Sequence, residues 1–220
     1  MNLFKTKDVK TTGFGRPCQY IHSQWQFYLN SHYRQNIPRN LMKDKKDIFA
    51  IIGSASSNSV NLKLVKKIAS LTESEFNLII FNDLKTLPHF DPELSVDNPP
   101  KQIVEFRNAI DKSDGIIICT PEYVCSIPSG LKNAIEWCIS TMIFSDKPCG
   151  LITASANGQK GHEELQLIMQ TAMAKFTNDT ILLIQGIKGK FDERGGLTDN
   201  EVHKRLDNYI SAFKKLVYNK

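Results

Sequence analysis

The polar side chains that are the first candidates for chemistry in this chain lie in one short stretch. The apolar run 48–52 (IFAII) is followed by Gly53 and a serine-rich loop, and a helical pattern of apolar residues begins after Asn61. In such a strand–loop–helix arrangement the loop N–H groups and the helix N-terminus converge on one point, and hydroxyls add further donors. This stretch therefore predicts a phosphate-binding loop. An ordinary strand–helix turn with Asn58 or Ser59 as N-cap fits equally well and stays open.

The composition of this loop excludes two common nucleotide motifs. It contains no lysine, so it is not the GxxxxGK[ST] loop of nucleotide-binding proteins, and its single glycine excludes GxGxxG. A serine-rich loop after the first strand suits the phosphate of a flavin better than a pyrophosphate.

Two later loops could complete a binding site. The loop that starts TPEY at residue 120 contains Pro121 and Pro128, which stiffen its backbone. A rigid loop beside a phosphate loop can hold a planar ring through its N–H and C=O groups, and Tyr123 can pack against that ring. The loop 153–162 (TASANGQKGH) has small residues that let its backbone approach a ligand closely. A plain turn and a helix-entry turn are the alternatives for these two loops.

Apolar strands alternate with helical patterns from residue 48 onward. Near-continuous apolar strands of this kind form a parallel sheet with helices on both faces. We therefore predict an α/β fold with a flavodoxin-like, doubly wound, five-stranded parallel sheet of order 2-1-3-4-5, whose ligand lies between the loops after strands 1 and 3. The predicted strands are 48–52, 77–81, 115–119, 148–153 and 180–184, and the predicted helices are 62–71, 102–112, 129–143, 161–174 and 199–218.

Two segments do not follow this alternation. Residues 83–100 are rich in proline and are predicted to be a long irregular connection of the kind that forms lids or interfaces. Residues 1–41 have no sustained apolar period, and Met42 is followed by a short charged lead into the first strand. Two interpretations stay open: residues 1–45 are a disordered or loosely docked extension of a domain 46–220, or they are not part of the native domain.

The charge of the chain is unevenly distributed. The formal net charge is +5, and residues 1–41 hold six lysines and arginines against Asp8 alone, so the remainder is neutral overall. The body therefore gives no electrostatic argument for binding nucleic acid or an anionic membrane. No apolar run approaches the roughly 20 residues that cross a bilayer. Five cysteines without a CxxC pair or metal-ligand spacing predict a reducing cytoplasm and no metal site.

Three segments, in this order and spacing, carry a resemblance to a known family. GSASSNSVN, TPEYVCSIPSGLKNAIEW and GLITASANGQKG resemble the NADPH-dependent FMN reductase family, which includes quinone, azo-dye and chromate reductases of flavodoxin-like fold. The resemblance covers about residues 46–218. It implies an NAD(P)H-dependent FMN oxidoreductase, similar to quinone reductases, that passes a hydride through bound FMN to a quinone, azo compound, free flavin or similar small acceptor. It also implies a homodimer or homotetramer.

The resemblance further implies roles for single residues. The FMN phosphate would be held by the side chains of Ser54, Ser59 and Asn61 together with the backbone from Ser56 to Val60. The isoalloxazine ring would be lined by Pro121, Glu122, Tyr123 and Val124, with Ser155 and Gly158 at its other edge. No side chain is implied as a catalytic acid or base, because the cofactor carries the chemistry.

The sequence departs from the family pattern at three positions. Ser56 stands where the family often has Arg, so a cation that would face the phosphate is missing and the expected affinity for FMN falls. Val124 replaces the usual Asn, and Ser129 the usual Gly. Two rival functions on the same fold stay open: a non-enzymatic FMN electron carrier, which would tend to be strongly acidic, and a flavin-free regulatory module.

Overall fold

The computed structural model describes residues 45–192 and 196–219 of the 220-residue chain. These residues belong to one compact unit, 44–220. The predictions for the N-terminal extension fall on residues outside the described ranges.

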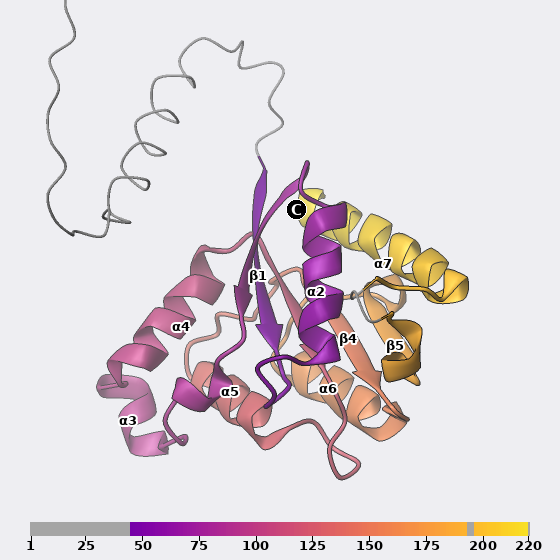
Figure 1. The fold of residues 1–220 in the computed structure, drawn as a ribbon. Helices are drawn as coiled ribbons and strands as arrows, with labels where there is room; N and C mark the ends of the chain where they lie inside the picture. Colours follow the sequence, from indigo (N-terminus) through magenta and orange to yellow (C-terminus); the bar gives the residue numbers. More distant parts are fainter. Residues whose placement is uncertain (1–44, 193–195, 220) are drawn as a thin grey trace, which may run out of the picture. The chain divides into compact units, whose positions relative to one another are not determined.

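A five-stranded sheet of order β2-β1-β3-β4-β5 forms the centre of this unit (Figure 1). Its strands are β1 Lys46–Ile52, β2 Phe76–Phe81, β3 Gly115–Thr120, β4 Cys149–Ser155 and β5 Ile181–Gln185. Every neighbouring pair is parallel, and the register aligns Ile48 of β1 with Leu78 of β2 and Gly115 of β3. The predicted fold class and strand order are therefore confirmed, and the carboxyl ends of all five strands lie at one edge.

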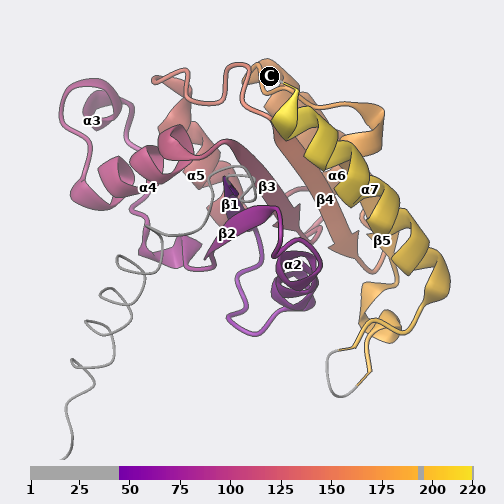
Figure 2. The same cartoon turned by 90° about the horizontal axis from the view of Figure 1, so that it is seen from above.

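Helices cover both faces of the sheet. They are α2 Val60–Leu71, α3 Pro92–Asp97, α4 Lys101–Lys112, α5 Ser129–Ile139, α6 Gln159–Thr171 and α7 Asn200–Tyr218, with short 3-10 helices η2 Leu84–Thr86, η3 Asn178–Thr180 and η4 Ile187–Lys190. Figure 2 shows α2 and α7 on one side of the sheet and α4 and α5 on the other. None of these helices, within the described ranges, has the length and apolar character to cross a membrane.

Alternate residues of each central strand supply two separate cores. On β1, Ile48, Ala50 and Ile52 pack in the cluster that contains the apolar residues of α2 and α7. Phe49 and Ile51 pack in the cluster that contains those of α4, α5 and α6. Side chains of a strand alternate between its faces, so a strand that is buried on both faces must be apolar at every position. This requirement explains the unbroken apolar runs of the sequence.

Three predicted details are wrong. Helix α6 spans Gln159–Thr171 rather than residues 161–174. The connection 83–100 is not irregular: η2 lies at its start, and α3 begins at Pro92 because the Asp91 side chain accepts a hydrogen bond from Glu93 N (2.9 Å). Helix α5 ends at Ile139 rather than at residue 143. The carbonyls of its last turn are taken by side chains, since Arg107 Nε donates to Trp137 O (2.7 Å) and Thr141 Oγ1 donates to Cys138 O (2.6 Å).

Candidate active site

The loop after β1 starts in contact with β3. Gly53 N donates to Cys119 O (2.8 Å), and a Cβ at Gly53 would lie 2.3 Å from Thr120 Oγ1, so only glycine fits there. Ser54 is buried, and its Oγ accepts a hydrogen bond from Ser56 N (3.3 Å). The same Oγ lies 3.4 Å from Tyr123 Oη. The loops after β1 and β3, which the sequence predicted to face each other at the switch point, therefore meet at this pair.

The N-terminus of α2 follows this loop. Ser59 is its N-cap, and Ser59 Oγ accepts a hydrogen bond from Leu62 N (3.1 Å). Asn61 is buried, donates through Nδ2 to Ala154 O (3.2 Å), and accepts through Oδ1 from Cys119 Sγ (3.3 Å). Cys119 can donate because burial raises the pKa of its thiol well above the usual value. The Asn61 amide thus ties α2 to the neighbouring strands β3 and β4, which fixes the helix N-terminus beside the loop.

The loop after β3 contains a tight hairpin that displays Tyr123. Tyr123 and Ser126 exchange two backbone hydrogen bonds of 2.9 and 3.0 Å, and the two residues between them have positive φ, 51° at Val124 and 59° at Cys125. Val124 is 99% exposed and Tyr123 is 42% exposed. The hairpin therefore leaves Tyr123 partly exposed to solvent, with its hydroxyl beside Ser54.

Two glutamates hold this hairpin against α6. Glu122 Oε2 accepts from Gly161 N (2.7 Å) and its Oε1 from Gly158 N (3.3 Å), so its carboxylate caps the N-terminus of α6. Glu164 Oε2 accepts from Ser126 Oγ (2.6 Å) and from Ile127 N (2.9 Å). The side chain of Glu122, predicted to line a ring, is thus engaged with the helix. Glu164 was not predicted, since nothing in the local sequence links it to the hairpin.

The loop after β4 is held in place by contacts with β4 and with the end of β5. Gly158 is the N-cap of α6 with φ of 88°, a conformation that glycine adopts readily. Ala156 O accepts from Gly186 N (3.0 Å), which ties the loop to the end of β5. His162 Nδ1 lies 2.9 Å from Thr153 Oγ1, and burial lowers the pKa of this histidine. These contacts hold Ser155 and Gly158 in place next to the Tyr123 hairpin.

A cleft of about 230 Å³ opens between the loops after β1, β2 and β3. Its walls are formed by Gly53, Ser54, Ala55, Ser57, Asn82, Asp83, Leu84, Lys85, Tyr123, Pro128, Ser129 and Gly130. Asn82 Nδ2 donates to Ser57 O (3.2 Å), while its buried Oδ1 has no hydrogen-bond partner among the described residues. Of the predicted site residues, Ser54 and Tyr123 line this cleft in the described part of the chain. The loop after β2, with Lys85, was missing from the predicted site.

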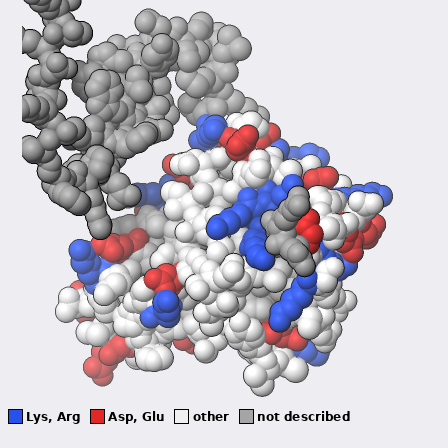
Figure 3. All heavy atoms as spheres, viewed as in Figure 1, with Lys and Arg blue, Asp and Glu red and all other residues white. Residues whose placement is uncertain are grey.

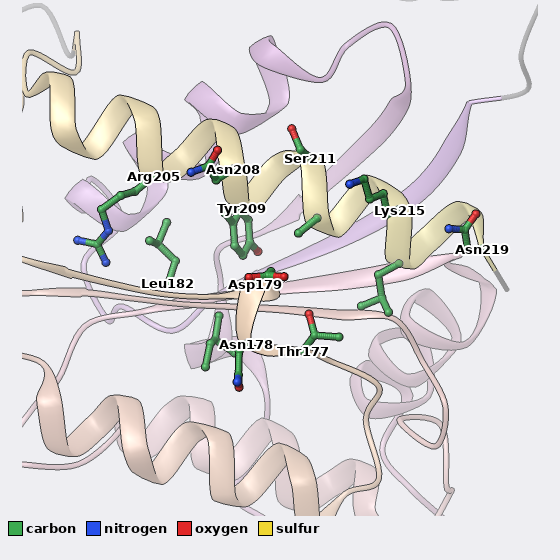
Figure 4. Close-up of a pocket in the computed structure, with 13 residues that line it drawn as sticks. Thr177, Asn178, Asp179, Leu182, Arg205, Asn208, Tyr209, Ser211, Lys215 and Asn219 are labelled. Atoms are coloured by element: carbon green, nitrogen blue, oxygen red, sulfur yellow. The ribbon is translucent and has the colours of Figure 1, made fainter.

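A larger groove of about 670 Å³ lies along α7 and is shown in Figure 4. Arg205, Asn208, Ser211, Lys215 and Asn219 follow one another along the helix, and the segment from Thr177 to Leu182 forms the opposite wall. The η3 part of that wall precedes β5, so it lies toward the amino ends of the strands. Parallel α/β sheets bind ligands at the carboxyl ends of their strands. The smaller cleft and its surrounding loops are therefore the candidate active site.

Comparison with known proteins identifies the family. The NADPH-dependent FMN reductase family matches residues 47–185. The chain belongs to this family. A relative from Vibrio ruber, NADH:(hydroxy)cinnamate reductase subunit CrdA, is 28% identical over 171 residues, which cover 74% of the chain and 83% of the relative. The 2-hydroxy-1,4-benzoquinone reductase of a Burkholderia species is 27% identical over 173 residues, which cover 76% and 93%.

A solved structure shows the same fold. FerB from Paracoccus denitrificans, described as a flavoenzyme NAD(P)H:(acceptor) oxidoreductase, superposes with a TM-score of 0.70 at 24% identity and covers 79% of this chain and 98% of its own. The fold is flavodoxin-like, as predicted. As a member of the FMN reductase family, the chain is an NAD(P)H-dependent oxidoreductase with FMN as its cofactor.

The residues at the carboxyl edge of the sheet fit an FMN cofactor. The serine loop offers hydroxyls and backbone N–H groups next to the α2 N-terminus, which suits a phosphate. The exposed ring of Tyr123, on a hairpin braced by Glu122 and Glu164, provides a flat, fixed surface for a ring system. The buried Asn82 Oδ1 could accept a hydrogen bond from a hydroxyl group of the cofactor. The family assignment and the donor set therefore agree.

Proposed function

We propose that this enzyme uses NAD(P)H to reduce a quinone or a similar small acceptor, with both substrates binding in turn beside Tyr123. The observation that carries the proposal is the meeting of the serine loop and the Tyr123 hairpin, where Ser54 Oγ and Tyr123 Oη lie 3.4 Å apart. When bound, FMN would supply the redox chemistry, which is the transfer of a hydride from NAD(P)H and of electrons to the acceptor. The Burkholderia relative named as a benzoquinone reductase supports a quinone as acceptor.

The chain's contribution to phosphate binding is a set of neutral donors. We assign the phosphate to Ser54, Ser56 and Ser59 and to the backbone of Val60 at the first turn of α2. Ser59 Oγ accepts from Leu62 N, so its own proton remains available for an anion. Asn61 takes a positioning role, because its amide binds Ala154 O and Cys119 Sγ.

The chain's contribution to ring binding is a rigid frame. Pro121 and Tyr123 are assigned to one side of the ring, and Val124 to its rim. Glu122 acts through the α6 cap, which fixes the hairpin against the loop that carries Ser155 and Gly158. Such a frame orients the ring and excludes water from it, and no step of the reaction requires a protein acid or base.

The surface charge distinguishes this protein from a flavin-based electron carrier. On the face shown in Figure 3, lysine and arginine side chains lie beside acidic ones, and no continuous acidic surface covers the described part of that face. Carriers of this fold tend to be strongly acidic, so the interspersed charges favour an enzyme that turns over small molecules.

An anaerobic spectral titration tests the proposed function. Purified full-length protein, supplemented with FMN, is expected to show flavin absorbance that NADPH or NADH bleaches and that 1,4-benzoquinone restores. Bound FMN that neither nicotinamide bleaches would indicate an electron carrier. Failure to bind FMN would indicate a flavin-free module, and both outcomes would contradict the proposal.

We also propose that the enzyme is a homodimer, or a homotetramer built from dimers. Exposed apolar side chains lie on or beside α3 and the end of α5, two segments that are joined by the 2.9 Å hydrogen bond between Ser95 Oγ and Ser140 Oγ. We call this the α3/α5 patch, and its members are Phe90, Leu94, Val96, Ile139 and Met142. Exposed patches of this kind mark protein–protein interfaces.

The location we propose is the cytoplasm. Cys119, Cys125, Cys138 and Cys149 are all free thiols in the structure. Cys125 is exposed, and such a thiol is compatible with a reducing compartment.

A further inference from the structure

We propose that Lys85 is the cation that neutralises the phosphate of FMN in this protein. The proposal rests on the proposed flavin site and adds a binding residue to it from the loop after β2. The serine loop itself, residues 53–59, contains no basic residue. A phosphate dianion bound by neutral donors alone would lack the charge-assisted bonds that are the stronger ones in such sites.

Lys85 belongs to the same cleft as the serine loop. Among the described residues that line the cleft, Lys85 is the only basic one, and Gly53, Ser54, Ala55 and Ser57 line the same cleft. The hydrogen bond from Asn82 Nδ2 to Ser57 O (3.2 Å) holds that turn directly against the serine loop. The loop after β2 is therefore joined to the phosphate loop.

The backbone at Lys85 is anchored by buried neighbours, whereas the Lys85 side chain is largely exposed. Lys85 lies in η2 between two buried anchors, Leu84 and Leu87. Leu84 packs against the start of α5, where a Cβ at Gly130 would lie 3.7 Å from Leu84 Cβ. The Lys85 side chain itself is 78% exposed. A rigid base with a long mobile side chain is suited to close over an anion after it has entered.

The present partner of Lys85 is weak enough to be exchanged. Lys85 Nζ lies 3.7 Å from Asp83 Oδ1, and both side chains are largely exposed. Pairs of this kind contribute little to stability, because water and salt screen them. The Asp83 side chain makes no capping hydrogen bond to η2, so no such bond fixes its carboxylate beside the lysine. A phosphate dianion in the cleft would compete well for the lysine, and Asp83 would oppose its binding.

The assignment is tested by comparing FMN with riboflavin, which lacks the phosphate. Apo-protein of the full chain is titrated with each flavin by fluorescence at low and high salt. In Lys85→Gln, FMN affinity is expected to fall roughly three- to ten-fold at low salt with a shallower salt dependence, while riboflavin affinity stays unchanged. In Asp83→Asn, FMN affinity is expected to rise. Lys101→Gln is the matched control, since Lys101 is an exposed lysine paired with Glu105 on α4.

If a second cation is placed at the phosphate, its effect on FMN affinity should depend on whether Lys85 is present. Ser56→Arg is expected to tighten FMN binding by roughly ten-fold if the new pair contributes about 1.4 kcal/mol. If Lys85 already serves the phosphate, this gain should be larger in the Lys85→Gln background than in the native one. Additive effects of the two substitutions would contradict a shared anion.

Four results would overturn the assignment. Equal FMN affinity in Lys85→Gln and native protein would show that Lys85 does not serve the phosphate, as would an equal loss for riboflavin. A raised KM for NADPH but not NADH, with FMN affinity unchanged, would move the lysine to the phosphate of the nicotinamide substrate. If native protein binds riboflavin and FMN equally poorly, the proposed function fails, and this assignment fails with it.

Discussion

Val124 adopts a backbone conformation that β-branched residues rarely tolerate. Its φ is 51°, at the first of two left-handed positions in the hairpin between Tyr123 and Ser126. Asn and Gly are the usual residues at such positions. Val124 replaces the Asn that is usual in the family. The substitution therefore introduces local backbone strain next to the proposed ring site.

Replacing this valine should stabilise the protein. Val124→Asn is expected to raise the free energy of unfolding by about 1 kcal/mol, since asparagine accommodates positive φ with less strain. Urea unfolding measures the change. Val104→Asn is the control, because Val104 is also exposed but lies in helical backbone of α4. An unfolding free energy that stays the same or falls in Val124→Asn would contradict the strain argument.

His162 should give the folded protein a pH dependence. It is buried beside Thr153, and desolvation lowers its pKa below the ordinary 6.5. As the pH falls below about 6.5, the unfolded chain therefore binds a proton before the folded protein does, and stability decreases until the folded pKa is reached. His162→Gln should flatten the pH profile of unfolding in that window. An unaltered slope in His162→Gln would show that other groups cause it.

At the scale of elements, the site depends on how the hairpin is attached to α6. The Glu122 carboxylate accepts hydrogen bonds from Gly158 N and Gly161 N at the helix N-terminus, where a negative charge is favourable. Glu122→Gln removes this charge and leaves one N–H without its acceptor. We expect a loss of about 1–2 kcal/mol in unfolding free energy and weaker binding of both FMN and riboflavin.

A control substitution tests whether the loss of a carboxylate at another position has the same effect as Glu122→Gln. Glu105→Gln removes a carboxylate that is exposed on α4 and pairs only with Lys101 in the described structure. It should change neither stability nor flavin affinity by a measurable amount. If Glu122→Gln behaves in the same way, the carboxylate does not brace the site.

The elements that the sequence predicted well are those set by local pattern. The strands and the five long helices follow from apolar periodicity, and the serine loop and the TPEY loop follow from residue type and place in the chain. Helix α3 was missed, because its apolar residues are sparse and its start is a proline with an aspartate cap. Glu164 and Lys85 were missed as site residues, since their places beside the hairpin and the serine loop exist only after folding.

At the scale of the whole molecule, one buried cation shapes the surface where a second copy would bind. Arg107 of α4 is buried, and its guanidinium donates to Trp137 O, Ser95 O (2.9 Å) and Ser95 Oγ (3.0 Å). Burial lowers the pKa of this arginine from its usual value. Its donors hold α3 against the end of α5, and the members of the α3/α5 patch lie on or beside these two segments.

This arrangement gives a direct test of assembly. If the α3/α5 patch is the contact surface of a two-fold dimer, each substitution appears twice in the interface, and an aspartate there is desolvated without a partner. Val96→Asp and Ile139→Asp are therefore expected to convert the native oligomer to a monomer in sedimentation velocity at micromolar protein. Leu167→Asp, at an equally exposed leucine of α6, should leave the mass unchanged. A native monomer would refute the proposed assembly outright, and an oligomer that survives both patch substitutions would place its interface on another face.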